Sequence, residues 1–166
     1  MADTKQIAKF EAGRQGIRYT YAAGKAKSYF YTKLRDEKKI VGVRCPQCKA
    51  VYVPPIDFCR KCFIETTGDW VEVSDKGIVW DFVIPRVSFV SFTEKVPYIY
   101  AQVKLDGVDD WFYHIVREAN LDKAHIGMRI EAVWAEGTGV MRSHVGNLFR
   151  EIRYFRPVDT AERAPL

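Results

Sequence analysis

The sequence predicts a mainly β chain with a helical N-terminal arm, a small metal-binding module and a five-stranded barrel. Residues 1–38 read as helical, four cysteines form two Cys-x-x-Cys pairs between positions 45 and 62, and polar and apolar residues alternate within residues 69–157. The chain has 166 residues, 48% of them hydrophobic, which suffices for one domain of ordinary size with an appended module. Residues 158–166 are expected to form a loose tail.

The N-terminal arm, residues 1–38, mixes apolar residues with lysines, arginines and glutamates. Ser28 fits the N-cap position of a helix, and Phe30, Tyr31 and Leu34 give that helix a short apolar stripe. Glycines at positions 13, 16 and 24 interrupt any single long helix, so we expect two short helices with a link. Such an arm buries too little apolar surface to be stable alone, so it should pack against a partner or the rest of the chain.

The metal-binding module is expected at residues 39–68 and has the layout of a rubredoxin-like zinc ribbon. A strand over residues 39–44 leads into the first cysteine pair, and a second strand, residues 50–53, stops at Pro54 and Pro55. A module of about 30 residues cannot form an adequate apolar core, so bound metal should supply much of its folding free energy.

The two cysteine pairs, Cys45 with Cys48 and Cys59 with Cys62, contain every cysteine of the chain. Four thiolates at this spacing suit one tetrahedral structural zinc per chain, because a catalytic zinc keeps an open position for water. A redox or disulfide role and iron binding are the alternatives. If zinc takes all four thiolates, no cysteine is left as a nucleophile.

Four cations flank the predicted ligands: Arg44, Lys49, Arg60 and Lys61. Four thiolates on one dication carry a formal surplus of two negative charges, which these cations could offset. Ordinary solvated cations are an equally good interpretation.

The barrel is expected over residues 69–157. Residues 98–105 show the alternation clearly, since Ile99, Ala101 and Val103 oppose polar or aromatic neighbours, and Asp106-Gly107 predicts a hairpin turn. The other strand candidates are residues 70–74 continuing into 77–87, 111–116, 129–135 and 148–155. One short helix fits residues 117–125, between the third and fourth barrel strands. Five strands with a helix in that position match the OB-fold.

Two loops of this barrel are candidate contact surfaces, because the loops after the first strand and between the fourth and fifth flank one binding face of an OB-fold. Residues 86–96 carry Phe89 and Phe92, and residues 136–147 carry Met141, Arg142 and His144. These side chains favour another protein or an acyl chain as the ligand. Alternatively, Phe89 and Phe92 only cap the end of the barrel.

The remaining chemistry is sparse. His114 lies in an apolar run and reads as a hydrogen-bonded wall residue rather than a base, and no Ser-His-Asp order or phosphate-binding glycine loop can be built. Residues 1–40 hold ten Lys or Arg against four Asp or Glu, whereas residues 41–166 hold sixteen against seventeen. The even charge of residues 41–166 disfavours nucleic-acid binding by this part of the chain.

The compartment is expected to be the cytoplasm. The sequence contains no run of about 18 apolar residues, the length that predicts a membrane span. Residues 1–6 lack the apolar core of a secretory signal.

The order of arm, ribbon and barrel resembles a known family, the thiolase-associated zinc-ribbon/OB-fold proteins, long catalogued as a domain of unknown function and linked to acyl-CoA metabolism. The ribbon followed by Pro54-Pro55 is its most specific motif, and Lys49 departs from the glycine usual after the second cysteine. The matching segments are residues 42–45, Cys48, 53–55, Cys59, Cys62, 74–79, 97–98, Val103, 105–107, 126–128 and 155–157.

The resemblance implies a non-catalytic accessory subunit that binds a thiolase-fold partner in a hetero-oligomer and sometimes contacts the shared acyl-CoA substrate. Members serve in thiolytic and aldol C–C bond chemistry, for example as the small subunit of benzoylsuccinyl-CoA thiolase. Thiolase chemistry needs a cysteine nucleophile and a second acid/base group, which would have to lie on the partner. Tyr29 and Phe30 of the arm, with neighbouring cations, could then dock on that partner or meet CoA phosphates.

Two other functions remain open from the sequence. A single-stranded nucleic-acid-binding module is the main alternative, because ribbons and OB-folds both occur in such proteins. A self-sufficient acyl-CoA hydrolase is the weaker one, because the chain offers neither a clear base nor a free nucleophile.

Overall fold

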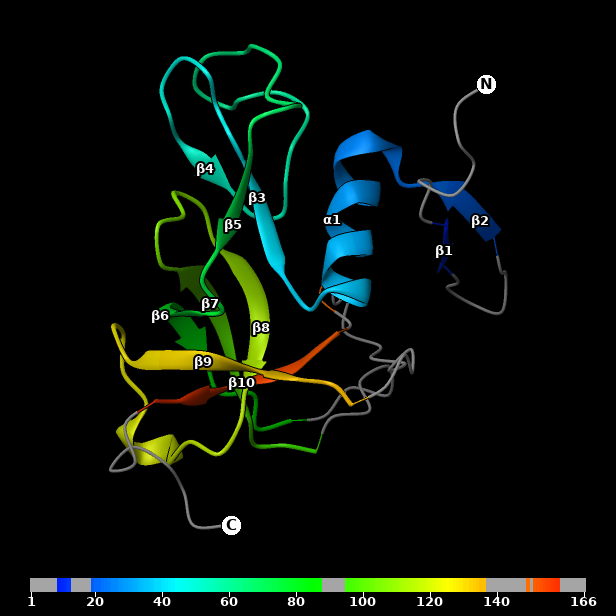
Figure 1. The fold of residues 1–166 in the computed structure, drawn as a ribbon. Helices are drawn as coiled ribbons and strands as arrows, with labels where there is room; N and C mark the ends of the chain where they lie inside the picture. Colours follow the sequence, from blue (N-terminus) through cyan, green and yellow to red (C-terminus); the bar gives the residue numbers. More distant parts are fainter. Residues whose placement is uncertain (1–8, 13–18, 88–94, 137–148, 150, 159–166) are drawn as a thin grey trace. The chain divides into compact units, whose positions relative to one another are not determined.

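The computed structural model describes residues 9–12, 19–87, 95–136, 149 and 151–158 of the 166-residue chain. The chain divides into two compact units, Met1–Glu72 and Val73–Leu166. The first contains a β-hairpin, one α-helix and a three-stranded sheet, and the second contains a closed barrel (Figure 1). This mainly β architecture confirms the predicted fold class. Within the described residues, no helix is long and apolar enough to cross a membrane.

The start of the arm is a β-hairpin, so the prediction of a helix there is wrong. Strands β1 (Lys9–Ala12) and β2 (Tyr19–Ala22) pair antiparallel, with Lys9 opposite Ala22 and Ala12 opposite Tyr19. The aromatic and β-branched residues of β2 favour an extended backbone. A pair of strands satisfies the backbone hydrogen bonds that a short, glycine-interrupted helix would leave open.

Helix α1 (Gly24–Asp36) confirms the helix predicted for the end of the arm, but it begins earlier than expected. The N-cap is Ala23, without a side-chain capping bond, so the assignment of Ser28 as N-cap is wrong. Ser28 lies inside the helix and is buried with Ala26, Phe30 and Leu34. The four-residue spacing of Ala26, Phe30 and Leu34 places these three on one face, and α1 packs against β3 (Figure 1).

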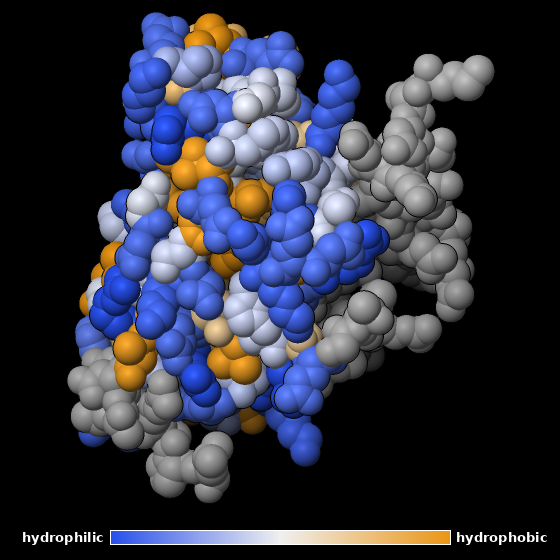
Figure 2. Space-filling model, in the orientation of Figure 1, coloured by the Kyte–Doolittle hydropathy of each residue, from blue (hydrophilic) through white to orange (hydrophobic). Residues whose placement is uncertain are grey.

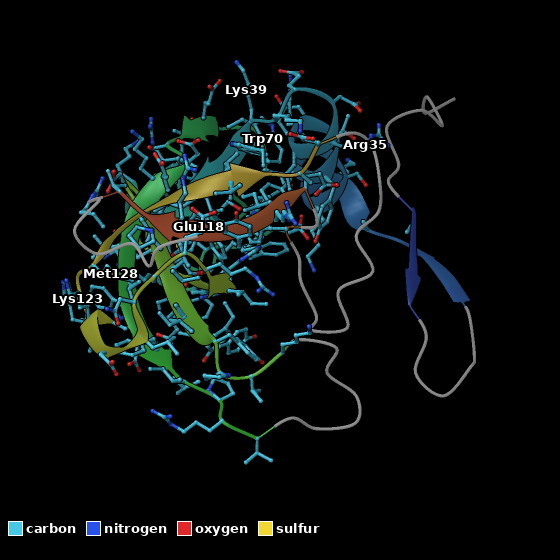
Figure 3. The ribbon with its side chains drawn as sticks, turned by 90° about the horizontal axis from the view of Figure 1, so that it is seen from below. Arg35, Lys39, Trp70, Glu118, Lys123 and Met128 are labelled. Atoms are coloured by element: carbon cyan, nitrogen blue, oxygen red, sulfur yellow. The ribbon has the colours of Figure 1, made fainter. Side chains whose placement is uncertain are left out.

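The zinc-ribbon sheet has the order β4-β3-β5. Its strands are β3 (Ile40–Arg44), β4 (Val51–Tyr52) and β5 (Trp70–Val73). Val43 and Tyr52 face each other across β3 and β4, and both belong to a small buried cluster that also contains Cys45, Ala50 and Cys59. The Lys39 ammonium (labelled in Figure 3) pairs with Glu72 of β5 at 2.8 Å. The sheet therefore builds its core around the cysteines.

The second unit is the predicted five-stranded barrel, closed in the order β10-β8-β7-β6-β9. Its strands are β6 (Lys76–Val83), β7 (Ile99–Leu105), β8 (Phe112–Val116), β9 (Arg129–Trp134) and β10 (Ile152–Pro157). The β8–β10 pair is parallel, and the other four pairs are antiparallel. This strand order is that of an OB-fold.

Strand β7 alternates buried and half-buried residues along its whole length, as its sequence predicts. Its hairpin turn is also confirmed, because Gly107 adopts φ +77° and the Val108 N–H donates to the Leu105 carbonyl at 3.2 Å. Met128, just before β9, is fully buried (Figure 3).

The helix predicted over residues 117–125 is reduced to a single 3-10 turn, η2 (Leu121–Lys123). Glu118 has a left-handed backbone (φ 56°), which stops a right-handed helix from starting there. Asn120 is extended, and its side chain accepts the Asp122 N–H at 3.0 Å. Because Asn120 caps only one short turn, the chain reaches β9 without a regular helix.

His114 is a buried part of the barrel wall, in agreement with the sequence. Its Nδ1 accepts the Ile115 N–H at 2.9 Å, and its ring meets the Phe149 and Phe155 rings edge-on, with centroids 6.5 and 5.3 Å away. Burial lowers the pKa of His114 to about 4, because the positive form would lose its hydration. His114 is therefore neutral at physiological pH.

Acidification should destabilise the barrel through His114. The unfolded chain takes up this proton near pH 6.5 and the folded barrel only near pH 4, so the free energy of unfolding should fall by about 3 kcal/mol between these values. NMR titration of the imidazole and urea unfolding at several pH values measure both quantities. His114→Gln should remove this part of the pH dependence, whereas His125→Gln, at an exposed position, should keep it. A His114 that titrates near pH 6.5 in the folded protein would contradict the assignment.

Candidate metal centre

Two equivalent backbone turns present the four cysteines. In the first, the Cys45 N–H donates to the Ala50 carbonyl at 2.9 Å and the Lys49 N–H to the Cys45 carbonyl at 3.0 Å. The second repeats the pattern: the Cys59 N–H donates to Ile64 at 2.9 Å, and the Phe63 N–H to Cys59 at 2.9 Å. Each turn therefore aims both of its thiols toward the other turn.

The residue after each second cysteine has a left-handed backbone, with φ 62° at Lys49 and 57° at Phe63. This conformation favours glycine, because it brings a side chain's Cβ close to the backbone. Lys49 nevertheless adopts it, and its turn makes the same two backbone hydrogen bonds as the second turn.

The cysteine sulfurs of this cluster fit one zinc ion. All four Sγ atoms lie within 4.8 Å of one another, and the Sγ atoms of Cys48 and Cys59 are 3.7 Å apart. A tetrahedron with Zn–S bonds of about 2.3 Å has edges of about 3.8 Å. An all-sulfur set with this separation suits Zn²⁺, and four such ligands leave no open position for a catalytic water.

Cys59 is the most strongly hydrogen-bonded sulfur of the four. Its Sγ lies 3.4 Å from the N–H groups of Lys61 and Cys62 and 3.4 Å from the Tyr52 hydroxyl. The Tyr52 hydrogen bond is the largest cause that lowers the pKa of the Cys59 thiol, to about 6, and the same bond raises the pKa of Tyr52. Desolvation raises the pKa of Cys62 to about 12. Cys59 is thus prepared for the thiolate form that metal binding requires.

Tyr52→Phe should weaken zinc binding about tenfold, because partners that orient a ligand typically change metal affinity by 10–100-fold. The variant removes only the hydroxyl that contacts Cys59 and keeps the buried ring in the ribbon core. Competition with a chromophoric chelator measures the affinity. Tyr113→Phe, which loses an exposed hydroxyl on β8, is the matched control. An unchanged affinity would show that the backbone N–H groups alone position Cys59.

Two of the flanking cations have local structural roles. The Lys49 ammonium donates to the Pro46 carbonyl at 2.7 Å, and the Arg60 guanidinium lies 5.9 Å from the centre of the Tyr52 ring. Lys49 therefore braces its turn, and Arg60 partly covers the Tyr52 ring.

The contact residues expected from the sequence fall into three groups. Tyr29 is 37% exposed and packs its ring against Trp70, with centroids 4.4 Å apart. Phe30 is fully buried, so its side chain serves the packing of α1 rather than the surface. The predicted loop contacts lie outside the described residues: Phe89, Phe92, Met141, Arg142 and His144.

The outer face of the barrel carries an aromatic patch that the sequence reading did not single out. Tyr100 and Tyr113 stack with centroids 5.3 Å apart, Trp111 meets Tyr113 edge-on at 5.2 Å, and the Lys104 ammonium lies 4.5 Å from the Trp80 ring centre. Tyr100 and Lys104 occupy outward positions in the alternation of β7, and this alternation is the sequence signal that could have placed them on the surface. Trp80 was harder to place, because a register shift between Val79 and Asp81 interrupts the alternation there.

Comparisons with known families match both modules. Residues 32–67 match the model of the ChsH2 rubredoxin-like zinc ribbon domain, and residues 70–135 that of the ChsH2 C-terminal OB-fold domain. A DUF35 domain-containing scaffold protein of Methanocaldococcus jannaschii is 30% identical over 101 residues, which cover 61% of this chain and 71% of that protein.

Two solved structures share the fold. A DUF35 family protein of unknown function from Sulfolobus solfataricus aligns with a TM-score of 0.55 and 20% identity, over 66% of this chain and 78% of its own. A chain of the Ltp2-ChsH2(DUF35) aldolase aligns with a TM-score of 0.57 and 22% identity, over 88% of this chain and 100% of its own. At these identities the likeness supports the fold alone.

Proposed function

This chain belongs to the ChsH2/DUF35 family of zinc-ribbon and OB-fold proteins, and from that premise we propose that it is a non-catalytic accessory subunit of an acyl-CoA-processing complex. Its partner would be a thiolase-type enzyme that makes or breaks C–C bonds by thiolytic or aldol chemistry. Two relatives support this proposal: one bears the name scaffold protein, and the other belongs to an aldolase with Ltp2.

The observation that carries the proposal is the state of the thiols. All four cysteines of the chain converge on one cluster, in which Cys45 and Cys59 are buried. Thiolytic chemistry requires a cysteine nucleophile with a nearby acid or base, and aldol chemistry requires the acid or base. With its thiols held by zinc, one ion per chain, and His114 enclosed in the barrel, this subunit would leave the reaction to its partner.

The second part of the proposal is that the subunit helps to hold the acyl-CoA. Tyr29 is partly exposed, and the Lys33 ammonium lies 5.6 Å from its ring centre, so aromatic and cationic groups occur together on α1. Tyr29 is therefore the described residue that we assign to partner or substrate contact. The loop residues Phe89, Phe92, Met141, Arg142 and His144 complete the proposed contact set.

Affinity purification of the tagged full chain from its native cell tests the proposal. A thiolase-fold subunit should co-purify in a fixed ratio, with one zinc per accessory chain, and acyl-CoA turnover should require both subunits. Turnover by the partner alone at the same rate would remove the accessory role. Recovery of the chain alone in several growth conditions would overturn the hetero-oligomer.

The aromatic patch on the barrel favours one alternative function, because the corresponding face of other OB-folds binds oligonucleotides through stacked aromatic rings. Micromolar binding of a labelled oligothymidylate that weakens steeply with salt would support this alternative. The even charge of residues 41–166, sixteen Lys or Arg against seventeen Asp or Glu, argues against it.

A further inference from the structure

Two phenylalanines are exposed on the second cysteine turn of the ribbon. Phe58 is 62% exposed and Phe63 is 82% exposed, and they immediately flank Cys59 and Cys62. Figure 2 shows apolar surface among hydrophilic side chains at the end of the ribbon. A single exposed apolar side chain is ordinary, but two aromatic rings on one short turn form a specific surface feature.

Phe63 also has an unfavourable backbone. Its φ of 57° lies in the left-handed region, which bulky residues rarely adopt and glycine adopts freely. The exposed ring gains little packing in return, and the hydrogen bond of this turn uses only the backbone N–H of Phe63. A glycine would make the same turn, so the ring itself needs another reason. Backbone strain that no packing or hydrogen bond of the side chain compensates is typical of functional positions.

The charges around these rings select the kind of partner. Residues 39–56 contain three cations and no carboxylate, and residues 57–68 contain two cations and two carboxylates. Lys39 is already paired with Glu72 at 2.8 Å, so with a four-thiolate zinc, whose formal charge is −2, the ribbon is left close to neutral. A nearly neutral ribbon does not attract a polyanion such as nucleic acid. Arg60 and Lys61, at the apex of the turn beside the two rings, complement a protein surface with a few carboxylates.

We propose that Phe58 and Phe63, with Arg60 and Lys61, form a docking surface for a partner protein that offers an apolar pocket rimmed by carboxylates. The two rings would enter the pocket, and the two cations would set the orientation. The inference rests on the proposed function only for the identity of the partner as a thiolase-type subunit.

The test uses the full zinc-loaded chain and the subunit that co-purifies with it, with affinity measured by biolayer interferometry. Phe63→Gly should keep the zinc content, keep or raise the melting temperature, and weaken binding at least tenfold. Phe58→Ser should weaken binding similarly, and hydrogen exchange of residues 57–64 should slow in the wild-type complex.

Two control variants lie outside the proposed docking surface. Lys49→Gly relieves the same left-handed backbone on the first turn, and Ile126→Ser removes a side chain of similar exposure (64%) from the other unit. Both controls should change affinity less than threefold.

The outcomes separate this surface from the proposed function. Unchanged binding by both phenylalanine variants would overturn the docking surface even if the partner is a thiolase-type subunit. If the partner has another fold and Phe63→Gly still weakens binding, the surface stands and the proposed function fails. Failure to capture any partner, or Phe63-dependent binding of oligothymidylate instead of protein, would overturn the docking surface.

Discussion

Cys59→Ser is expected to unfold the zinc ribbon and leave the barrel folded. Zinc contributes about 10–16 kcal/mol of apparent binding free energy in small zinc modules, and folding depends on that contribution. The buried cluster of the ribbon is small and includes Cys45 and Cys59 themselves, so little apolar core remains without the metal. NMR spectra should lose the dispersed signals of residues 39–68 and keep those of the barrel, and the variant should retain no bound zinc.

Chelation of wild-type zinc is the matched experiment, because it leaves every side chain in place. It should produce the same spectral change, and added zinc should reverse it. Gln47→Ala, at an exposed position inside the first Cys-x-x-Cys, should preserve both zinc and fold. A Cys59→Ser protein with an intact ribbon spectrum and no metal would mean that packing alone folds the module.

Gly77→Ala is expected to destabilise the barrel by about 3 kcal/mol or more, a size associated with severe overpacking. A Cβ at Gly77 would lie 2.2 Å from the Lys104 carbonyl oxygen and 2.8 Å from the Leu105 Cα. Both atoms belong to the backbone of β7, which pairs with β6 at this point, so no flexible side chain can move aside. Urea unfolding monitored by signals of the barrel measures the loss.

Gly107→Ala separates steric conflict from backbone preference. Gly107 has φ +77°, and a Cβ at this position would have no neighbouring atom within 4 Å. Its substitution should therefore cost only about 1 kcal/mol, the usual penalty of a left-handed backbone. If Gly77→Ala is no more harmful than Gly107→Ala, then β6 and β7 can separate locally, and the close approach is not essential.

The sequence predicts the ribbon and the barrel well because their signals are local. Cysteine spacing specifies the turns, and the alternation in residues 99–105 reports directly which side chains enter the core. Strand boundaries are less sharply specified: the last strand is expected at residues 148–155 and lies at Ile152–Pro157.

The arm is predicted poorly because its structure depends on pairing rather than on propensity. Strands β1 and β2 are four residues each, and neither has enough periodicity to distinguish an extended pair from a short helix. Ser28 illustrates a second limit. Its hydroxyl suits an N-cap, but packing of Phe30 and Leu34 rewards one more helical turn before it, and this longer helix buries Ser28.

The candidate metal site is likewise predicted in part from local sequence signals and in part not. The four ligands can be named from the cysteine spacing. The hydrogen bond between Tyr52 and Cys59 could not be predicted in this way, because the pairing of β3 with β4 and the position of the second cysteine turn bring these two side chains together. The exposure of Phe63 likewise follows from its place in the turn, since an apolar residue beside a cysteine would ordinarily be read as core.

Closure of the barrel by the parallel β8–β10 pair has a consequence for how other molecules can approach it. Each of the five described barrel strands has a neighbour on both sides, although β8 and β10 meet in register only at Val116 and Phe155. No described barrel strand is therefore unpaired along a whole edge, which disfavours recognition by β-augmentation. Molecules that bind the barrel would mainly contact its side chains, and selectivity could change through surface substitutions without altering the sheet.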